Sequence, residues 1–436
     1  MCRVARAGHN MPRGDGEFLL FTVLAYVMGS FFCTVCTADV VRFLLCRVGA
    51  RRHILFGEFM NYFEQYDWDT ILKMYPPRNY DVSEYHKILS PEFPEFLKKY
   101  LSLPILQRLS GIGLLCGTDW TPLYKNRFYY SRLDHSVGVA LIVWHFTKDK
   151  AQTIAGLLHD VSTPVFSHVS DFRKGDALTQ TATEEDNSSL VCQDKKLAEL
   201  LKTDGLTVNQ VKDYHVYPIA DNEIPQLSAD RLEYMFPSGM ALEGSWTLEQ
   251  IKETYADISV LKNEQNIDEL GFNSVSIAEN YCRLFCMTGH ILQLQEDKVC
   301  LQLLGEIMNR AVELKILSEN DFMTLSEKQI LEKIENAQKT FKSKPANDGP
   351  ASEYFFRLYK TFRTMTKIEH TQNALPPEDY FSVNLKVKMR YINPLVKTEN
   401  GIFRLSEVSD VARKIISDFQ TYTDTPFGCV KLVALN

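Results

Sequence analysis

Two histidines and two aspartates, far apart in the chain, have side chains of the types that bind divalent metal ions in proteins. His135 lies in an apolar stretch, the pair His159-Asp160 follows a second one, and Asp230 opens a third. Polar groups among apolar helical residues cost free energy unless they are paired or bound to a metal. We therefore expect these four residues to hold one divalent cation.

This donor set indicates the ion and the chemistry it would support. Imidazole nitrogens combined with carboxylate oxygens suit Mn, Fe, Zn or Co, and suit Mg less well. Four protein ligands on an octahedral ion leave two positions for water and a substrate oxygen. Such an ion lowers the pKa of a bound water and neutralises phosphoryl charge. The pattern therefore predicts hydrolysis of a phosphate ester or anhydride, with metal-activated water attacking phosphorus.

The elements that position these residues are expected to be helices. Apolar residues recur at helical spacing around His135, namely Leu133, Val137, Ala140, Leu141 and Trp144. The next helix carries its apolar face on Ala151, Ile154, Ala155 and Leu158 and is expected to end near Asp160. Further helices are predicted over 277–293, 298–315, 325–338 and 353–366. The fold class is therefore mainly α, with a helical core that contains the four candidate ligands.

The C-terminal part of the chain has a different pattern. The segment 343–352 is rich in proline and glycine and is predicted to be a linker. Apolar and polar residues alternate over Tyr380–Tyr391, which is typical of a strand, and 428–435 is similar. With a helix over 406–420, these elements predict a small α+β module. The expected domains are an extension over 1–55, a helical domain over 56–342 and the module over 353–436.

The extension contains an uncharged segment, Phe18–Ala38, that is long enough to cross a bilayer as a helix. Arginines flank it on both sides, so they indicate no orientation. Three interpretations stay open: a membrane anchor, a buried or interfacial hydrophobic helix, and an upstream extension outside the natural protein. The catalytic domain is expected in the cytoplasm, anchored to a membrane if 18–38 spans the bilayer.

The overall charge argues against a nucleic-acid partner. The 436-residue chain has a formal net charge of −7, so it has no global positive field to attract a nucleic acid. A phosphorylated small molecule would instead need local cations, supplied by a metal or by a few arginines.

The candidate ligands and the segments around them together match the sequence pattern of a known family. The H…HD…D arrangement resembles HD-domain phosphohydrolases. The wider match resembles their deoxynucleoside-triphosphate triphosphohydrolase branch, and it is carried by Leu106–Leu109, Ser131–His135, Ala155–Asp160 and Pro164–His168. Members of that branch are mostly helical and hydrolyse dNTPs to nucleoside and triphosphate. They often assemble through the helical core, so the resemblance also implies a homo-oligomer and a nucleotide substrate.

The resemblance implies roles for five further residues. Arg132 and His168 would contact phosphates, Gln107 would lie near the sugar, and Tyr234 would line the nucleotide pocket. Asp171 matches a carboxylate that orients a catalytic histidine, which makes His168 and Asp171 the expected catalytic pair.

The chain also departs from the family pattern. The family has a Gly-His pair where this chain has Ser162-Thr163, and a His-Glu pair where it has Glu184-Glu185. Two imidazoles associated with proton transfer are therefore missing. The departures leave two alternatives open: a metal- and nucleotide-binding regulatory protein with little turnover, and a phosphodiesterase.

Overall fold

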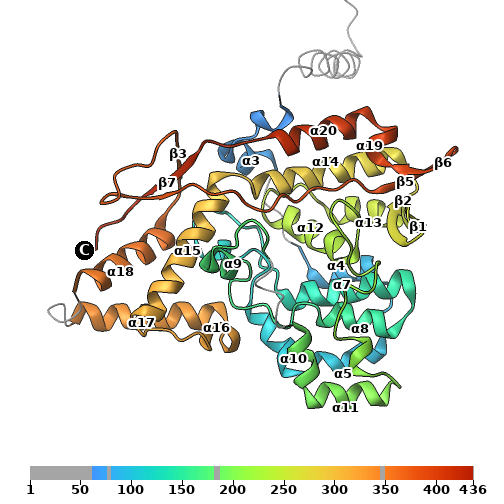
Figure 1. The fold of residues 1–436 in the computed structure, drawn as a ribbon, viewed down its shortest axis with the longest axis horizontal. Coiled ribbons are helices and arrows are strands. Elements are labelled where there is room, and N and C mark those ends of the chain that lie inside the picture. Colours follow the sequence, from blue (N-terminus) through green and yellow to red (C-terminus); the bar gives the residue numbers. More distant parts are fainter. Residues whose placement is uncertain (1–60, 76–79, 181–186, 344–348, 436) are drawn as a thin grey trace, which may run out of the picture. The chain divides into compact units, whose positions relative to one another are not determined.

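Helices make up most of the structure, a computed structural model that describes residues 61–75, 80–180, 187–343 and 349–435 (Figure 1). The expectation of a mainly α fold is confirmed. The hydrophobic segment 18–38 lies outside the described residues. Among the helices of the described ranges, none has both the length and the apolar character needed to cross a membrane.

The elements follow one another in a long helical series with a few short strands. The α-helices are α3 (Trp68–Met74), α4 (Val82–Leu89), α5 (Lys98–Leu101), α6 (Pro104–Gln107), α7 (Arg132–Thr147), α8 (Lys150–Leu158), α9 (Val169–Lys174), α10 (Asn187–Gln193), α11 (Lys195–Thr203), α12 (Ala229–Ala241), α13 (Leu248–Ala256), α14 (Val275–Ile291), α15 (Gln295–Glu313), α16 (Asp321–Thr324), α17 (Glu327–Ser343), α18 (Gly349–Thr364), α19 (Leu405–Val408) and α20 (Asp410–Thr421). Short 3₁₀ turns are η1 (Tyr62–Gln65), η2 (Glu95–Leu97), η3 (Arg108–Gly111), η4 (Thr118–Trp120) and η5 (Val208–Gln210).

Helices α7 and α8 pack side by side and carry two of the candidate ligands (Figure 1). A reciprocal cap begins α7, since the Ser131 hydroxyl accepts from the Asp134 N–H and the Asp134 carboxylate accepts from the Ser131 N–H. Asp149 caps α8 in the same region of the chain. Most of α7 is buried, because apolar residues lie on all its sides and α4, α8 and α12 pack around it.

A glycine lets α7 and α12 approach each other closely. A Cβ placed on Gly138 would overlap the carboxylate of Glu233 from α12. Glycine is therefore required there, and its absence of a side chain allows the Glu233 carboxylate to enter the interface between the two helices.

The C-terminal part of the chain contributes strands to two small sheets, and one of these sheets also contains strands of the helical core. The strands are β1 (Ile258–Lys262), β2 (Asp268–Phe272), β3 (Glu369–Thr371), β4 (Tyr380–Val383), β5 (Leu395–Thr398), β6 (Gly401–Arg404) and β7 (Phe427–Lys431). One sheet has the order β1-β2-β5-β6 and the other has the order β3-β7-β4. Strand β5 pairs parallel to β2, with Gly271 opposite Leu395.

The C-terminal elements also pack on core helices: α18 packs on α15, and α20 lies along α14 (Figure 1). The division at 342 and 353 into separate domains stays a prediction, but residues 61–436 form one compact unit.

The strand expected over Tyr380–Tyr391 ends early. Only Tyr380–Val383 is a strand, and residues 384–394 run on without regular structure. Their backbone bonds to the core instead of to a strand: the Lys388 N–H donates to the Ala177 carbonyl, and the Gln293 side chain donates to the Lys388 carbonyl. The alternation of apolar and polar residues predicted a strand here, whereas the apolar side chains pack against the helical core.

Candidate metal centre and active site

The two candidate imidazole ligands face each other at the centre of the fold. The Nε2 atoms of His135 and His159 lie 3.1 Å apart. Nε2 of His135 lies 3.7 Å from Asp160 Oδ2 and 3.1 Å from Asp230 Oδ1. For Nε2 of His159, both of these separations are 3.6 Å. The structure thus brings together all four residues that the sequence predicts as ligands, from α7, the end of α8 and the first turn of α12.

The other nitrogen of each ring is held by an acceptor. His159 Nδ1 lies 2.7 Å from the Gly156 carbonyl oxygen, which can only accept, so this nitrogen carries the proton. His135 Nδ1 lies 2.5 Å from Glu233 Oε2, which places a proton there as well. In the neutral rings, both Nε2 lone pairs therefore point at the same space, beside two carboxylates.

These donors fit a divalent cation. Ligand atoms about 2.1 Å from a metal and at right angles to one another lie about 3.0 Å apart, and tetrahedral ligands lie about 3.4 Å apart. Two of the separations between each imidazole and its neighbouring donors are 3.1 Å, within this range, and the other three, 3.6 to 3.7 Å, exceed it slightly. Facing lone pairs repel unless a cation or a proton lies between them. Histidines that bind metals usually donate their other N–H to a carboxylate or carbonyl, as both do here.

Asp160 is kept ionised by the groups around it. Burial alone would raise its pKa, but the charge and hydrogen bond of Arg132 oppose burial, and the pKa lies below the usual range. Arg132 Nη1 lies 2.8 Å from Asp160 Oδ2. On the other oxygen, the Thr163 hydroxyl donates to Oδ1 at 2.9 Å. Thr163 stands where the family has a histidine, and here it supports a candidate ligand. Residues 184 and 185, the other departure, lie outside the described residues.

A strained turn after α8 positions Arg132. Phe166 and Ser167 both have left-handed backbone conformations, with φ of 62° and 53°. Such conformations are costly for residues other than glycine and persist where the surrounding structure requires them. This turn places the Ser167 hydroxyl 3.0 Å from Arg132 Nε. The guanidinium is therefore held between Ser167 and Asp160, next to the metal ligands.

His168 and Asp171 form the pair that the sequence predicts. Nδ1 of His168 lies 2.9 Å from Asp171 Oδ2, and the aspartate is fully buried. Burial lowers the pKa of His168; the charges of Arg390 and Arg132 lower it further, and the hydrogen bond to Asp171 opposes them. The imidazole is therefore neutral at pH 7, with Nε2 available on the side of the pocket.

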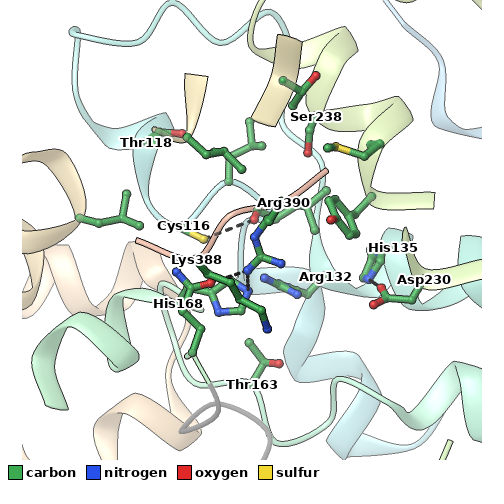
Figure 2. A pocket seen from close by; sticks show the side chains of 18 of the residues that line it. Cys116, Thr118, Arg132, His135, Thr163, His168, Asp230, Ser238, Lys388 and Arg390 are labelled. Atoms are coloured by element: carbon green, nitrogen blue, oxygen red, sulfur yellow. Dashed lines mark hydrogen bonds and ion pairs between the residues drawn. The ribbon is translucent and has the colours of Figure 1, made fainter. Parts of the chain in front are cut away.

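One cavity of about 140 Å³ connects these groups. Figure 2 shows His135 and Asp230 on one side of the pocket, and Arg132, His168, Lys388 and Arg390 gathered beside them. The remaining wall is partly apolar, with hydroxyl groups between the apolar side chains; among its residues are Leu115, Thr118, Tyr234, Ser238, Thr288 and Leu301. Tyr234, expected in the nucleotide pocket, lines this cavity.

Gln107 requires a correction. It was expected near a sugar, but its side chain is exposed, donates to the Leu101 carbonyl at 2.7 Å and does not line the cavity. Its neighbours Leu106 and Leu109 are buried, which turns position 107 towards solvent. The next residue faces inwards instead: Arg108 donates to the carbonyls of Val161 and Thr163, and closes the turn that follows the ligand pair.

Four further residues of this site were not predicted from the sequence. Glu233 lies three residues after Asp230, on the same side of α12, so helical spacing could have indicated it. Asp297 lines the cavity; burial raises its pKa to about 7, and the Tyr124 hydroxyl donates to it at 3.1 Å. Lys388 and Arg390 come from the segment expected to be a strand, and no sequence pattern connects them with this pocket.

A helical fold around three buried residues, His135, His159 and Asp160, with the half-buried Asp230 beside them, defines a protein with a candidate metal site. No protein-family model matches the chain. The chain is 22% identical over 324 residues to the uncharacterised protein YdhJ of Bacillus subtilis. The aligned region covers 73% of this chain and 89% of YdhJ. It is 30% identical over 132 residues to a metal-dependent phosphohydrolase of Cordyceps militaris. This aligned region covers 30% of this chain and 36% of that protein.

Two crystal structures have a similar fold. One is a hypothetical protein from Aquifex aeolicus, with a TM-score of 0.52 and 15% identity, covering 78% of this chain and 92% of that one. The other is a phosphohydrolase from Bacteroides thetaiotaomicron, with a TM-score of 0.52 and 14% identity, covering 79% of this chain and 97% of that one. At these identities the similarity shows a common fold.

Proposed function

We propose that this chain is a metal-dependent phosphohydrolase of the HD type whose substrate is a nucleotide, by analogy with dNTP triphosphohydrolases. One observation carries the proposal: the facing Nε2 atoms of His135 and His159, 3.1 Å apart, have Asp160 and Asp230 beside them. The named similarity to a metal-dependent phosphohydrolase supports the general class. The sequence resemblance described above supports the nucleotide.

The four ligands would hold a divalent ion, with Mn, Fe, Zn, Co and Mg as candidates. When bound, such an ion supplies an acidified water and neutralises phosphoryl charge. Arg132 contributes a fixed positive charge, since Asp160 and Ser167 hold its guanidinium at the edge of the cluster. We assign it to a phosphate oxygen of the substrate, because a guanidinium binds phosphate through several directed hydrogen bonds.

His168 would deliver a proton to the leaving oxygen. Its Nδ1–H donates to Asp171, which orients the ring and leaves Nε2 towards the cavity. In the free protein, the neighbouring guanidinium charges help to keep the imidazole neutral. A substrate anion beside those guanidiniums would offset their charge, and His168 could then take a proton at Nε2 and donate it.

Tyr234 and the partly apolar wall would receive the organic part of the substrate. The cavity has ionic groups on one side and apolar side chains with scattered hydroxyls on the other. A nucleotide has the same division, with a charged phosphate at one end and a planar base at the other. Small-molecule pockets commonly combine an apolar lining with a few polar groups in this way.

The test is a substrate panel with purified protein and each candidate ion. The panel contains dNTPs, phosphate monoesters and cyclic dinucleotides, and the released products are separated and identified. We expect hydrolysis of a nucleotide that requires the added ion and is lost in His159→Ala. A matched control is His145→Ala, because His145 lies on α7 but does not line the cavity.

A second candidate function is a regulatory protein that binds metal and nucleotide with little turnover. The observation that favours it is Thr163, whose hydroxyl binds Asp160 at the position of a family histidine. Tight nucleotide binding without any released phosphate, triphosphate or nucleoside would support this alternative. Hydrolysis of cyclic dinucleotides alone would support a phosphodiesterase.

A further inference from the structure

The irregular segment between β4 and β5 delivers a charged side chain to the cavity of the helical core. Arg390 of this segment lines the cavity and lies next to His168 (Figure 2). Its Nη2 lies 2.5 Å from Gln180 Oε1 and 3.5 Å from His168 Nε2. Its guanidinium carbon lies 5.9 Å from the centre of the Tyr234 ring.

Arg390 forms no ion pair with the described residues, although Asp297 of the same cavity is near enough for the Arg390 charge to lower its pKa. Within the described ranges, no carboxylate oxygen lies within 4.0 Å of its guanidinium, whereas Arg132 in the same cavity is paired with Asp160. The side chain is half-buried, so part of its hydration is lost. A charge in this position is costly unless an opposite charge pairs with it, and an anion in the cavity would provide that charge.

The segment is held firmly against the core. The Lys388 N–H donates to the Ala177 carbonyl, and the Gln293 amide donates to the Lys388 carbonyl at 3.0 Å. Val387, between Lys386 and Lys388, is buried in the cavity wall. These contacts fix the backbone two residues before Arg390, so the Arg390 side chain reaches the cavity from an anchored segment.

We propose that Arg390 is a positioning residue that binds an anionic phosphate group of the substrate, and that the C-terminal part of the chain completes the active site in this way. The proposal rests on the proposed function, because it assigns Arg390 to the substrate of the same cavity. Arg132 would hold the phosphate nearer the metal ligands, and Arg390 would hold an oxygen on the side of His168 and Gln180. Bidentate guanidinium contacts to phosphate suit this task.

The test measures binding of inorganic tripolyphosphate to the full chain by calorimetry, with manganese present. Arg390→Gln removes the charge, Arg390→Lys keeps it, and Lys386→Gln is the control, since Lys386 is an exposed cation of the same segment that does not line the cavity. We expect Arg390→Gln to weaken binding by about tenfold or more, Arg390→Lys to recover part of the affinity, and Lys386→Gln to bind within about twofold of the wild type. Manganese content and melting temperature are measured for every variant, so that a loss of folding is recognised.

Unchanged tripolyphosphate affinity in a folded Arg390→Gln variant would overturn the proposal, and so would an equal loss in Lys386→Gln. The outcome is separate from that of the proposed function. If hydrolysis requires the metal but tripolyphosphate binding does not depend on Arg390, the hydrolase is retained and this role for Arg390 is rejected. Arg390-dependent binding without hydrolysis of any substrate would retain the role and reject the hydrolase.

Discussion

The Glu233 carboxylate lies 2.5 Å from Nδ1 of His135, so an acidic residue outside the four candidate ligands orients the imidazole that faces the cluster. Asp230 lies one helical turn earlier on α12 and contacts Nε2 of the same ring. One helix therefore holds both sides of His135, which makes the position of α12 against α7 decisive for the site.

Glu233→Gln is expected to weaken metal binding by about tenfold to a hundredfold, as is usual when the carboxylate behind a metal-binding histidine is lost. Affinity would be measured by competition with a chelator of known strength. Glu249→Gln is the control, because Glu249 is exposed on α13. Equal affinities in the wild type and Glu233→Gln would show that the charge of Glu233 does not strengthen metal binding.

Gly138→Ala should disturb the same contact from the other helix. The added methyl group would overlap the Glu233 carboxylate, and overpacking of this kind costs about 1–3 kcal/mol of unfolding free energy. Denaturant unfolding and metal titration should both show a loss. Gly305→Ala in α15 is a suitable comparison, since its nearest neighbour would be at 3.4 Å and ordinary contact is expected. A fully stable Gly138→Ala protein would argue against the close approach of α7 and α12.

Removing the metal is expected to lower the melting temperature. A ligand that binds only the folded state at a hundred times its Kd stabilises the protein by about 2.7 kcal/mol. Thermal unfolding with a chelator and with excess manganese would measure the difference. In Asp230→Asn the difference should shrink strongly, because one carboxylate of the cluster is neutralised. A variant that gains as much stability from manganese as the wild type would place the ion elsewhere.

The pH dependence of catalysis should report His168. A protonated His168 is needed as the acid, so kcat/KM falls as pH rises through its pKa. The Asp171 hydrogen bond raises that pKa and the Arg390 charge lowers it. Asp171→Asn should therefore move the alkaline limb to lower pH, and Arg390→Gln should move it to higher pH. Shifts in the same direction, or no shifts, would show that another group supplies the proton.

An ion-pair cluster apart from the four candidate metal ligands should make stability depend on pH. His370 on β3 lies 2.9 Å from Asp424 through Nδ1 and 3.0 Å from Glu296 through Nε2. Hydrogen bonds to Asp424 and Glu296 raise its pKa from 6.5 to about 10. The folded state therefore holds this proton more tightly than the unfolded state, so the stabilisation is complete below pH 6.5 and is lost as pH rises through 10.

The melting temperatures of the wild type and His370→Gln should therefore differ at pH 6 and converge towards pH 10. Comparing the two proteins at each pH cancels the effect of other groups that titrate over the same range. A difference that stays constant with pH would mean that His370 is uncharged in the folded protein.

Much of the candidate metal centre could be predicted from residue types and spacing. His135, His159, Asp160 and Asp230 are polar residues at the boundaries of apolar helical segments, and the structure brings them to one point. The helices could be predicted equally well, because the apolar residues on the faces that pack together recur every three or four positions. The contact between Asp171 and His168 is also local, since residues three apart in the chain meet on a helical turn.

Gln107, Lys388 and Arg390 could not be placed in this way. Gln107 lies in a matching motif, yet the buried neighbours Leu106 and Leu109 turn it outwards, and orientation of this kind depends on packing partners elsewhere in the chain. Arg390 lies 222 residues from His168, and its segment alternates like a strand but is held by the core at Ala177 and Gln293.

The residue type at each position thus determined which side chains can bind a metal, and local spacing determined which segments are helical, because both follow from a position and its near neighbours in the chain. The presence of Lys388 and Arg390 in the cavity was decided by the packing of distant segments. Their positions follow from contacts with long sequence separation, such as those of the Arg390 segment with the core, and periodicity contains no information about these contacts.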